Sequence, residues 1–155
     1  MDIVILTVGK CRNRAIAEGV EDYIGRLGRY SRISVKPVKA EPIYKKSDTR
    51  KIKRTESERL LKCVPQDHYV YALDRSGHSC DSGKFATGFG SVMRNKSAFS
   101  FIIGGPLGLD KSILERADRI LSLSKMTFPH EMALLILCEQ IYRAMTILNN
   151  EKYHK

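Results

Sequence analysis

The chain has 155 residues, of which 43% are hydrophobic and 28% charged, enough for one domain, residues 1–155, with a buried core. No apolar run approaches the roughly 20 residues that cross a bilayer, and the first residues lack the features of a secretory leader. We therefore expect a cytoplasmic protein with no membrane partner. The four cysteines form no C-x-x-C pair and the four histidines lack metal-ligand spacing, so we expect neither disulfides nor a bound metal.

The positive charge of the chain is large and uneven. Basic residues exceed acidic ones by 10, and residues 10–62 alone hold 16 basic and 7 acidic side chains. The densest part runs from Lys45 to Arg54. A one-sided positive field favours a polyanionic partner, most simply nucleic acid; the alternative is an ordinary solvated helix face.

The pattern of apolar residues predicts strands and helices in alternation. A buried strand over residues 2–9 is followed by a helix over 14–29 and a second strand over 33–38. Ser47 is a plausible N-cap for a polar helix over 47–63. The remaining elements are a strand over 69–73 closed by a turn over 74–77, a helix from Asp81 to about Arg94, a strand over 98–103, a short helix over 111–117, a strand over 120–123 and a long helix from Pro129 to about Leu148.

This alternation predicts an α/β fold, a Rossmann-like, mostly parallel sheet covered by helices on both faces. Ligands of such sheets bind beyond the carboxyl ends of the strands. Three of these ends are of interest: Leu73, Gly104 and Leu123.

The last predicted helix is apolar on every side over residues 133–138. A helix that is apolar all round must be buried all round, and in a chain of this size a second copy most simply covers one side. We therefore expect a homodimer; the alternative is the central helix of a monomer. Glu139 and Arg143 are four residues apart and suit an intrahelical ion pair, although Arg143 could instead face a site at a subunit junction.

Two strand-end segments, Ile102–Asp110 and Leu121–Glu131, are poor in ionisable side chains. Such loops suit an adenosine-like ligand that is recognised by peptide groups, with glycines permitting close approach. The glycines at 104, 105 and 108 fit neither the phosphate-binding loop nor the G-x-G-x-x-G spacing, and nothing supports a hydrolase. A plain helix-entry turn is the alternative.

Four motifs in fixed order resemble one family. They are Ile103-Gly104-Gly105-Pro106-Leu107-Gly108-Leu109, Leu123-Ser124-Lys125-Met126-Thr127-Phe128-Pro129-His130, Glu139-Gln140-Ile141-Tyr142-Arg143-Ala144 and Tyr153-His154-Lys155. Over the whole chain, the sequence is similar to the SPOUT-class methyltransferases that modify N3 of a pseudouridine in 23S ribosomal RNA of the large subunit. The resemblance implies a C-terminal trefoil knot, S-adenosyl-L-methionine as cofactor, and a homodimer with its active site at the subunit interface.

The resemblance also assigns residues. Its cofactor positions fall on Leu73, Gly104 and the run Leu123, Ser124, Lys125, Met126, Thr127 and Phe128, with Gly105 as an adjacent candidate. His154 is the candidate for assisting proton loss from the imide or orienting the base, Tyr153 for contacting the nucleoside, and Arg143 for holding phosphate or imide charge. Candidates for contact with ribosomal RNA are Arg12, Arg14, Lys45, Lys46, Arg50, Lys51, Lys53 and Arg54. The alternative function is a non-catalytic RNA-binding module on the same fold.

Overall fold

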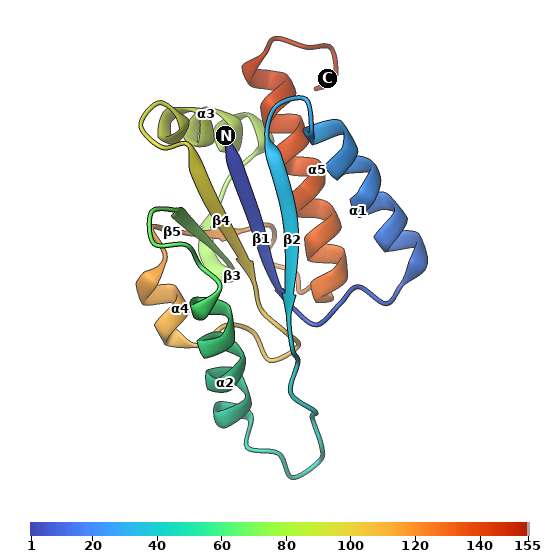
Figure 1. Ribbon diagram of the computed structural model, residues 1–155, viewed down its shortest axis with the longest axis vertical. Coiled ribbons are helices and arrows are strands. Elements are labelled where there is room, and N and C mark those ends of the chain that lie inside the picture. The colour runs from blue at the N-terminus through green and yellow to red at the C-terminus, as the bar shows by residue number, and fades with distance from the viewer. Residues whose placement is uncertain (155) are drawn as a thin grey trace.

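The computed structural model describes residues 1–154 and contains a single five-stranded sheet (Figure 1). All strand pairs are parallel, in the order β2-β1-β4-β3-β5. The elements along the chain are β1 Asp2–Val8, α1 Arg14–Leu27, β2 Arg32–Val38, α2 Thr49–Lys62, β3 Tyr69–Ser79, α3 Ser82–Met93, β4 Ala98–Ile103, α4 Lys111–Arg116, β5 Arg119–Ser122 and α5 His130–Leu148. The α/β class with a parallel sheet is confirmed.

Helices cover both faces of the sheet, because the strands are apolar on both sides. Ile3 and Ile5 of β1 pack into the core that lies under α1, α3 and α5. Val4 and Leu6 face the second core, where the sheet meets Leu60 of α2 and other residues of α2 and α4. Parallel strands buried on both faces read as continuous apolar runs, as β1 does.

Two local predictions are wrong. Ser47 does not cap α2; its hydroxyl accepts the N–H of Tyr44 at 2.8 Å, and Asp48 caps the helix by accepting from the N–H groups of Arg50 and Lys51. The turn predicted over 74–77 does not end β3, because the strand pairs with β5 again at His78 and continues to Ser79. The turn is instead a bulge inside the strand.

The bulge of β3 lies directly against β5. A Cβ atom at Gly77 would stand 2.7 Å from the carbonyl carbon of Ile120, so only glycine permits this approach of the two backbones. The C-terminal knot that the resemblance implies concerns how the chain threads through this region, and it stays a prediction.

Helix α5 is buried on its flanks by its own chain. It packs between α1 and α3 on one face of the sheet (Figure 1). Leu134, Leu137, Cys138 and Ile141 are fully or almost fully buried, whereas Met132 and Leu148 are exposed at its two ends. The apolar character of α5 is therefore largely explained within one chain, and it does not by itself require the expected homodimer. No helix within residues 1–154 is long and apolar enough to span a membrane.

Candidate active site

The three strand ends predicted to hold the cofactor lie side by side. Leu73 of β3 pairs with Ile103 of β4 on one side and with Leu121 of β5 on the other. Gly104 follows the first partner immediately, and Leu123 follows the second by two residues. The structure thus brings together the three loops that the sequence places apart.

The glycine loop after β4 is a tight turn that folds back on itself. The N–H of Gly108 donates to the carbonyl of Gly105 at 2.9 Å, and Gly108 has a φ of +79°. A Cβ atom at Gly104 would lie 2.8 Å from the carbonyl carbon of Gly108. Gly104 is therefore required by the closure of its own loop, and not only by the approach of a ligand.

Two buried polar residues of α2 contact the glycine loop. Glu56 is 2% exposed, and its Oε1 accepts the N–H of Glu41 at 2.9 Å. Its Oε2 has no partner within residues 1–154 and lies 2.9 Å from the position of a Cβ at Gly105. Ser57 accepts the N–H of Asp110 at 3.0 Å, at the far end of the loop. Helix α2 is thereby joined to both ends of the loop.

The loop from Leu123 to Phe128 connects β5 with α5 and contacts the bulge of β3. Ser122 donates its hydroxyl to the carbonyl of Ser124 at 3.0 Å, and the hydroxyl of Ser124 accepts the N–H of Met126 at 3.0 Å. Lys125 reaches the carbonyl of Arg75 at 3.3 Å. Lys125, Met126 and Thr127 are exposed, so an incoming ligand meets this loop directly.

A cavity of about 320 Å³ opens beside the end of β5. Leu123 lines it together with Ser82 and Phe85 of α3 and with Ile136 and Gln140 of α5. The hydroxyl of Ser82 donates to the side-chain oxygen of Gln140 at 2.7 Å and so joins the two helices at the cavity wall. The cavity is mostly apolar with a few polar groups, which is the usual make-up of a small-molecule site.

The predicted catalytic side chains form one cluster at the C-terminal end of α5. Arg143 donates from Nε to Glu139 at 2.9 Å and contacts Nδ1 of His154 through Nη1 at 3.3 Å. Tyr153 donates to the same Glu139 oxygen at 3.2 Å, and the guanidinium of Arg143 lies 4.8 Å from its ring centroid. The predicted ion pair between Glu139 and Arg143 is present.

The electrostatics of this cluster fix two protonation states. The hydrogen bond to Glu139 raises the pKa of Arg143, which stays a cation. Burial and the hydrogen bond with Tyr23 raise the pKa of Tyr153, which therefore stays a protonated donor at neutral pH. Neither group can accept a proton in this arrangement.

Most of the predicted cofactor loop and the predicted catalytic cluster lie towards different ends of α5. The loops meet the N-terminal end of α5, whereas the cluster and the C-terminus lie at its other end (Figure 1). At 1.5 Å per residue, Arg143 lies about 20 Å along the helix from His130, which follows the cofactor loop. Leu123, at the start of that loop, lies nearer the cluster, because it lines a cavity together with Gln140 of α5. It is the far end of the loop, towards Phe128, that is separated from the predicted catalytic residues within one chain.

The basic residues predicted to contact RNA fall into two groups. Lys45, Lys46, Arg50, Lys51, Lys53 and Arg54 lie on α2 and the loop before it, at the end of the sheet where the strands finish (Figure 1). Lys53 lies close enough to contribute to the lowered pKa of Asp110, although the hydrogen bonds from Ser112 lower that pKa more. The other group, Arg12 and Arg14, stands at the start of α1. Arg14 and Arg54 pair with nearby glutamates in exposed contacts.

Sequence reasoning missed the residues that brace these loops. Glu131 accepts the N–H groups of Arg12 and Asn13, both at 3.0 Å, and these bonds lower its pKa. It thereby holds the loop before α1 against the start of α5. Glu131 looks like an ordinary helix-start residue in the sequence. Of these residues, only Glu56 and Ser57 of α2 could have been noticed in the sequence, because a charged and a hydroxyl side chain are unusual on a helix face that packs on a core.

The comparisons with known sequences and structures point to one family. A family model described as "Predicted SPOUT methyltransferase" matches residues 1–154. Proteins named "Ribosomal RNA large subunit methyltransferase H" from Exiguobacterium sibiricum and Ruminiclostridium cellulolyticum are 42% and 43% identical to this chain, with 100% of both chains covered. The protein of the same name from Pseudothermotoga lettingae is 40% identical over 99% of both.

Solved structures share the fold at low sequence identity. The structure called "Probable Methyltransferase from Bordetella pertussis Tohama I" superimposes with a TM-score of 0.57 at 14% identity, over 93% of each chain. TrmJ from Z. mobilis gives 0.52 at 14% identity, over 94% of this chain and 70% of that one. With a family model over almost the whole chain and relatives at this identity, the chain belongs to the SPOUT methyltransferase family.

Proposed function

We propose that this protein is an S-adenosyl-L-methionine-dependent methyltransferase that modifies N3 of a pseudouridine in 23S ribosomal RNA, as a homodimer in the cytoplasm. The observation that carries the proposal is that the glycine loop after β4, the loop after β5 and the bulge of β3 meet in a chain of the SPOUT family. The names of relatives at 40–43% identity supply the ribosomal RNA of the large subunit. The strong positive charge of residues 10–62 suits that substrate.

The residues at the strand ends fit an adenosyl cofactor. Leu73 and Leu123 offer apolar contact, and Gly104 and Gly105 permit the tight turn of the glycine loop and its close packing on Val8 and Glu56. The segment from Leu123 to Phe128 belongs to no helix or strand, so those of its peptide groups that Ser122 and Ser124 do not engage can hydrogen-bond a base and ribose. When bound, S-adenosyl-L-methionine supplies a methyl group already activated by its sulfonium.

The protein then has to orient the base and allow the proton on N3 to leave. Methyl transfer to N3 requires that the imide proton leave, which we assign to a solvent water, and negative charge on the imide is stabilised by a nearby cation. Arg143 is that cation. Its contact with Nδ1 of His154 leaves the proton of a neutral imidazole on Nε2, which makes His154 a donor to a carbonyl of the base. This favours the orienting role of His154 over the proton-accepting one.

The homodimer follows from the separation of the two halves of the site. Arg143 of the catalytic cluster lies about 20 Å along α5 from His130, where the segment that follows the cofactor loop enters the helix. In a symmetric dimer, each copy can present its cluster to the loops of the other. We propose that each active site is composed in this way.

The direct test is mass spectrometry of ribosomal RNA from cells that lack this protein. One N3-methyl group on a pseudouridine of the large subunit should be missing, and purified protein with S-adenosyl-L-methionine should restore it. Separated subunits and assembled ribosomes, supplied in parallel, identify the substrate. Ribosomal RNA with an unchanged set of methyl groups would refute the proposal.

The alternative of a non-catalytic RNA-binding module is tested by calorimetry. We expect heat on titration with S-adenosyl-L-methionine. Tight RNA binding without that heat would favour the alternative.

A further inference from the structure

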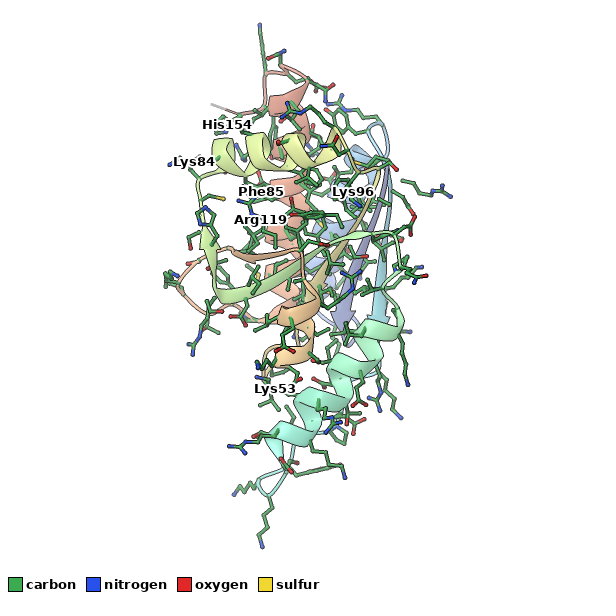
Figure 2. All side chains as sticks on the ribbon, turned by 90° about the vertical axis from the view of Figure 1, so that its left-hand side faces the viewer. Lys53, Lys84, Phe85, Lys96, Arg119 and His154 are labelled. Carbon is green, nitrogen blue, oxygen red and sulfur yellow. The ribbon has the colours of Figure 1, made fainter. Side chains whose placement is uncertain are left out.

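A second, smaller cavity of about 90 Å³ lies between β3, β5 and α3. We call it the Tyr71 cavity; the side chains that line it include Tyr71 and His78 of β3, Lys84 of α3 and Arg119 of β5. Figure 2 shows Lys84, Phe85 and Arg119 grouped beside α3 on this side of the molecule. None of these residues is among those predicted to bind cofactor, to act in catalysis or to contact RNA.

The hydroxyl of Tyr71 is buried without a partner. Tyr71 is 1% exposed, and its oxygen makes no hydrogen bond within residues 1–154. Its ring is fixed by stacking on Phe101, with centroids 4.8 Å apart. Burial raises the pKa of Tyr71 to about 12, and the nearby guanidinium of Arg119 opposes that rise, so the hydroxyl keeps its proton at neutral pH. Because a guanidinium only donates, Arg119 cannot accept this proton. A buried donor without an acceptor is unfavourable, and a ligand that accepts from it relieves that cost.

The other polar groups of the cavity are mainly basic. Arg119 and His78 have no salt bridge within residues 1–154, and Lys84 contacts Asp81 only at 3.6 Å in an exposed pair. The guanidinium of Arg119 lies over α3, with Nη1 3.2 Å from the position of a Cβ at Gly88, so the glycine leaves room for it. The neighbouring Asp118 is engaged by the N–H of Val70 at 2.7 Å.

We propose that the Tyr71 cavity binds one backbone phosphate of the RNA substrate, held by the hydroxyl of Tyr71, the guanidinium of Arg119 and the side chains of His78 and Lys84. Donors from three separate elements converge there, and the cavity is too small for a nucleoside. Arg119, His78 and Lys84 are exposed, so a phosphate that is part of a chain can reach them from solvent. The hydroxyl of Tyr71 is closed to solvent, so the phosphate contacts it when the exposed side chain of Arg119 moves aside. The identity of the ligand as RNA rests on the proposed function.

The existence of the site is tested by thermal unfolding in sodium phosphate against sodium chloride of equal ionic strength. The variants are Tyr71→Phe, which keeps the stacked ring, and Arg119→Gln. Their matched controls are Tyr69→Phe, on the same strand outside the cavity, and Lys96→Gln, an exposed lysine elsewhere on the surface (Figure 2). Phosphate should raise the Tm of the wild type and of both controls, and this rise should disappear in Tyr71→Phe and Arg119→Gln. An equal rise in all five proteins would overturn the proposal.

The fold of Tyr71→Phe is checked in the same experiment. Because the substitution removes a buried donor that has no partner, its Tm in chloride should be no lower than that of the wild type. The result in phosphate is then a property of the site and not of a damaged core.

The assignment to RNA is tested by the affinity for large-subunit ribosomal RNA at several salt concentrations. Tyr71→Phe, which changes no charge, should weaken binding about ten-fold through the loss of one charge-assisted hydrogen bond. Arg119→Gln should also lower the salt dependence by about one phosphate contact. Unchanged RNA affinity in Tyr71→Phe would leave a site for a small anion only and overturn the assignment.

The Tyr71 cavity shares Cys80, Phe85 and Leu121 with the 320 Å³ cavity that Leu123 of the cofactor loop also lines, so titration with S-adenosyl-L-methionine is needed to separate the two. Cofactor affinity should be the same in the wild type and in Tyr71→Phe. A parallel loss of cofactor affinity would show that the cavity takes the carboxylate of the cofactor instead. If the wild type bound no cofactor, the proposed function would fail while the effect of phosphate on Tm still decided the existence of the site.

Discussion

Mixing two inactive variants tests the composite active site. The first variant, His154→Ala, removes a side chain of the catalytic cluster and leaves the loops intact. The second, Gly104→Ala, places a Cβ atom 2.8 Å from the backbone of Gly108 and so forces the glycine loop to shift. Gly104 follows β4, and His154 lies beyond the C-terminal end of α5, so the two substitutions alter different parts of the proposed site. Each variant alone should be almost inactive.

The expected activity of the mixture follows from symmetry. When equal amounts of the two variants exchange subunits at random, about half of the dimers contain one copy of each. In such a dimer, one site joins an intact loop of one copy to an intact His154 of the other, and the second site carries both lesions. The mixture should therefore recover about 25% of the wild-type activity per subunit.

The assay measures transfer of a labelled methyl group to ribosomal RNA after subunit exchange, with analytical ultracentrifugation confirming that all samples are dimers. Titration with S-adenosyl-L-methionine should show that His154→Ala keeps its cofactor affinity. If the mixture stays as inactive as its components while mixed dimers form, each chain uses its own tail and the reasoning from the length of α5 is wrong.

Three further predictions concern single residues. Glu139→Gln should lower turnover about ten-fold with little change in cofactor affinity, because Glu139 holds both Arg143 and Tyr153 through charge-assisted hydrogen bonds. Single-turnover kinetics measure the turnover and calorimetry measures the cofactor affinity. Equal losses in both would contradict this role. Because the pKa of Glu131 is lower in the folded protein, its carboxylate stabilises the fold at pH values above the unfolded-state pKa of a glutamate, and this contribution is lost as the pH falls through the folded-state pKa. Glu131→Gln should therefore flatten the acid limb of a plot of unfolding free energy against pH. An acid limb identical to that of the wild type would refute this. Asp48→Ala should lower the free energy of unfolding by about 1 kcal/mol, and Ser47→Ala by less, in urea titrations; the reverse order would restore Ser47 as the cap.

The strands of the sheet were predictable because each one is marked by the residues of its own short segment. The apolar runs of β1 and β4 are long enough to indicate buried parallel strands, and the order of strands and helices then limits the ligand site to the strand ends. The same reasoning could not foresee the bulge of β3, since Asp74-Arg75-Ser76-Gly77 has the composition of any turn. Its continuation as a strand depends on pairing with β5, more than 40 residues later in the chain.

The site was predictable only in part, for a related reason. The residues of the glycine loop and of the catalytic cluster are visible as motifs, because they fall in short contiguous segments of the sequence. Their separation along α5 depends on how the helix lies across the sheet, which the motifs do not encode. Glu131 and Glu56 hold loops from other parts of the chain, so their roles depend on contacts across more than 40 residues.

The bare carboxylate oxygen of Glu56 has a consequence for engineering. A designer who scans this protein for unfavourable buried groups will select Glu56, since replacing a buried acid by a hydrocarbon of similar size often makes a protein more heat-resistant. Such a change would also remove the support beneath Gly105 and release the peptide of Glu41. A thermostable version obtained in this way would gain melting temperature at the expense of the turn that we propose holds the cofactor.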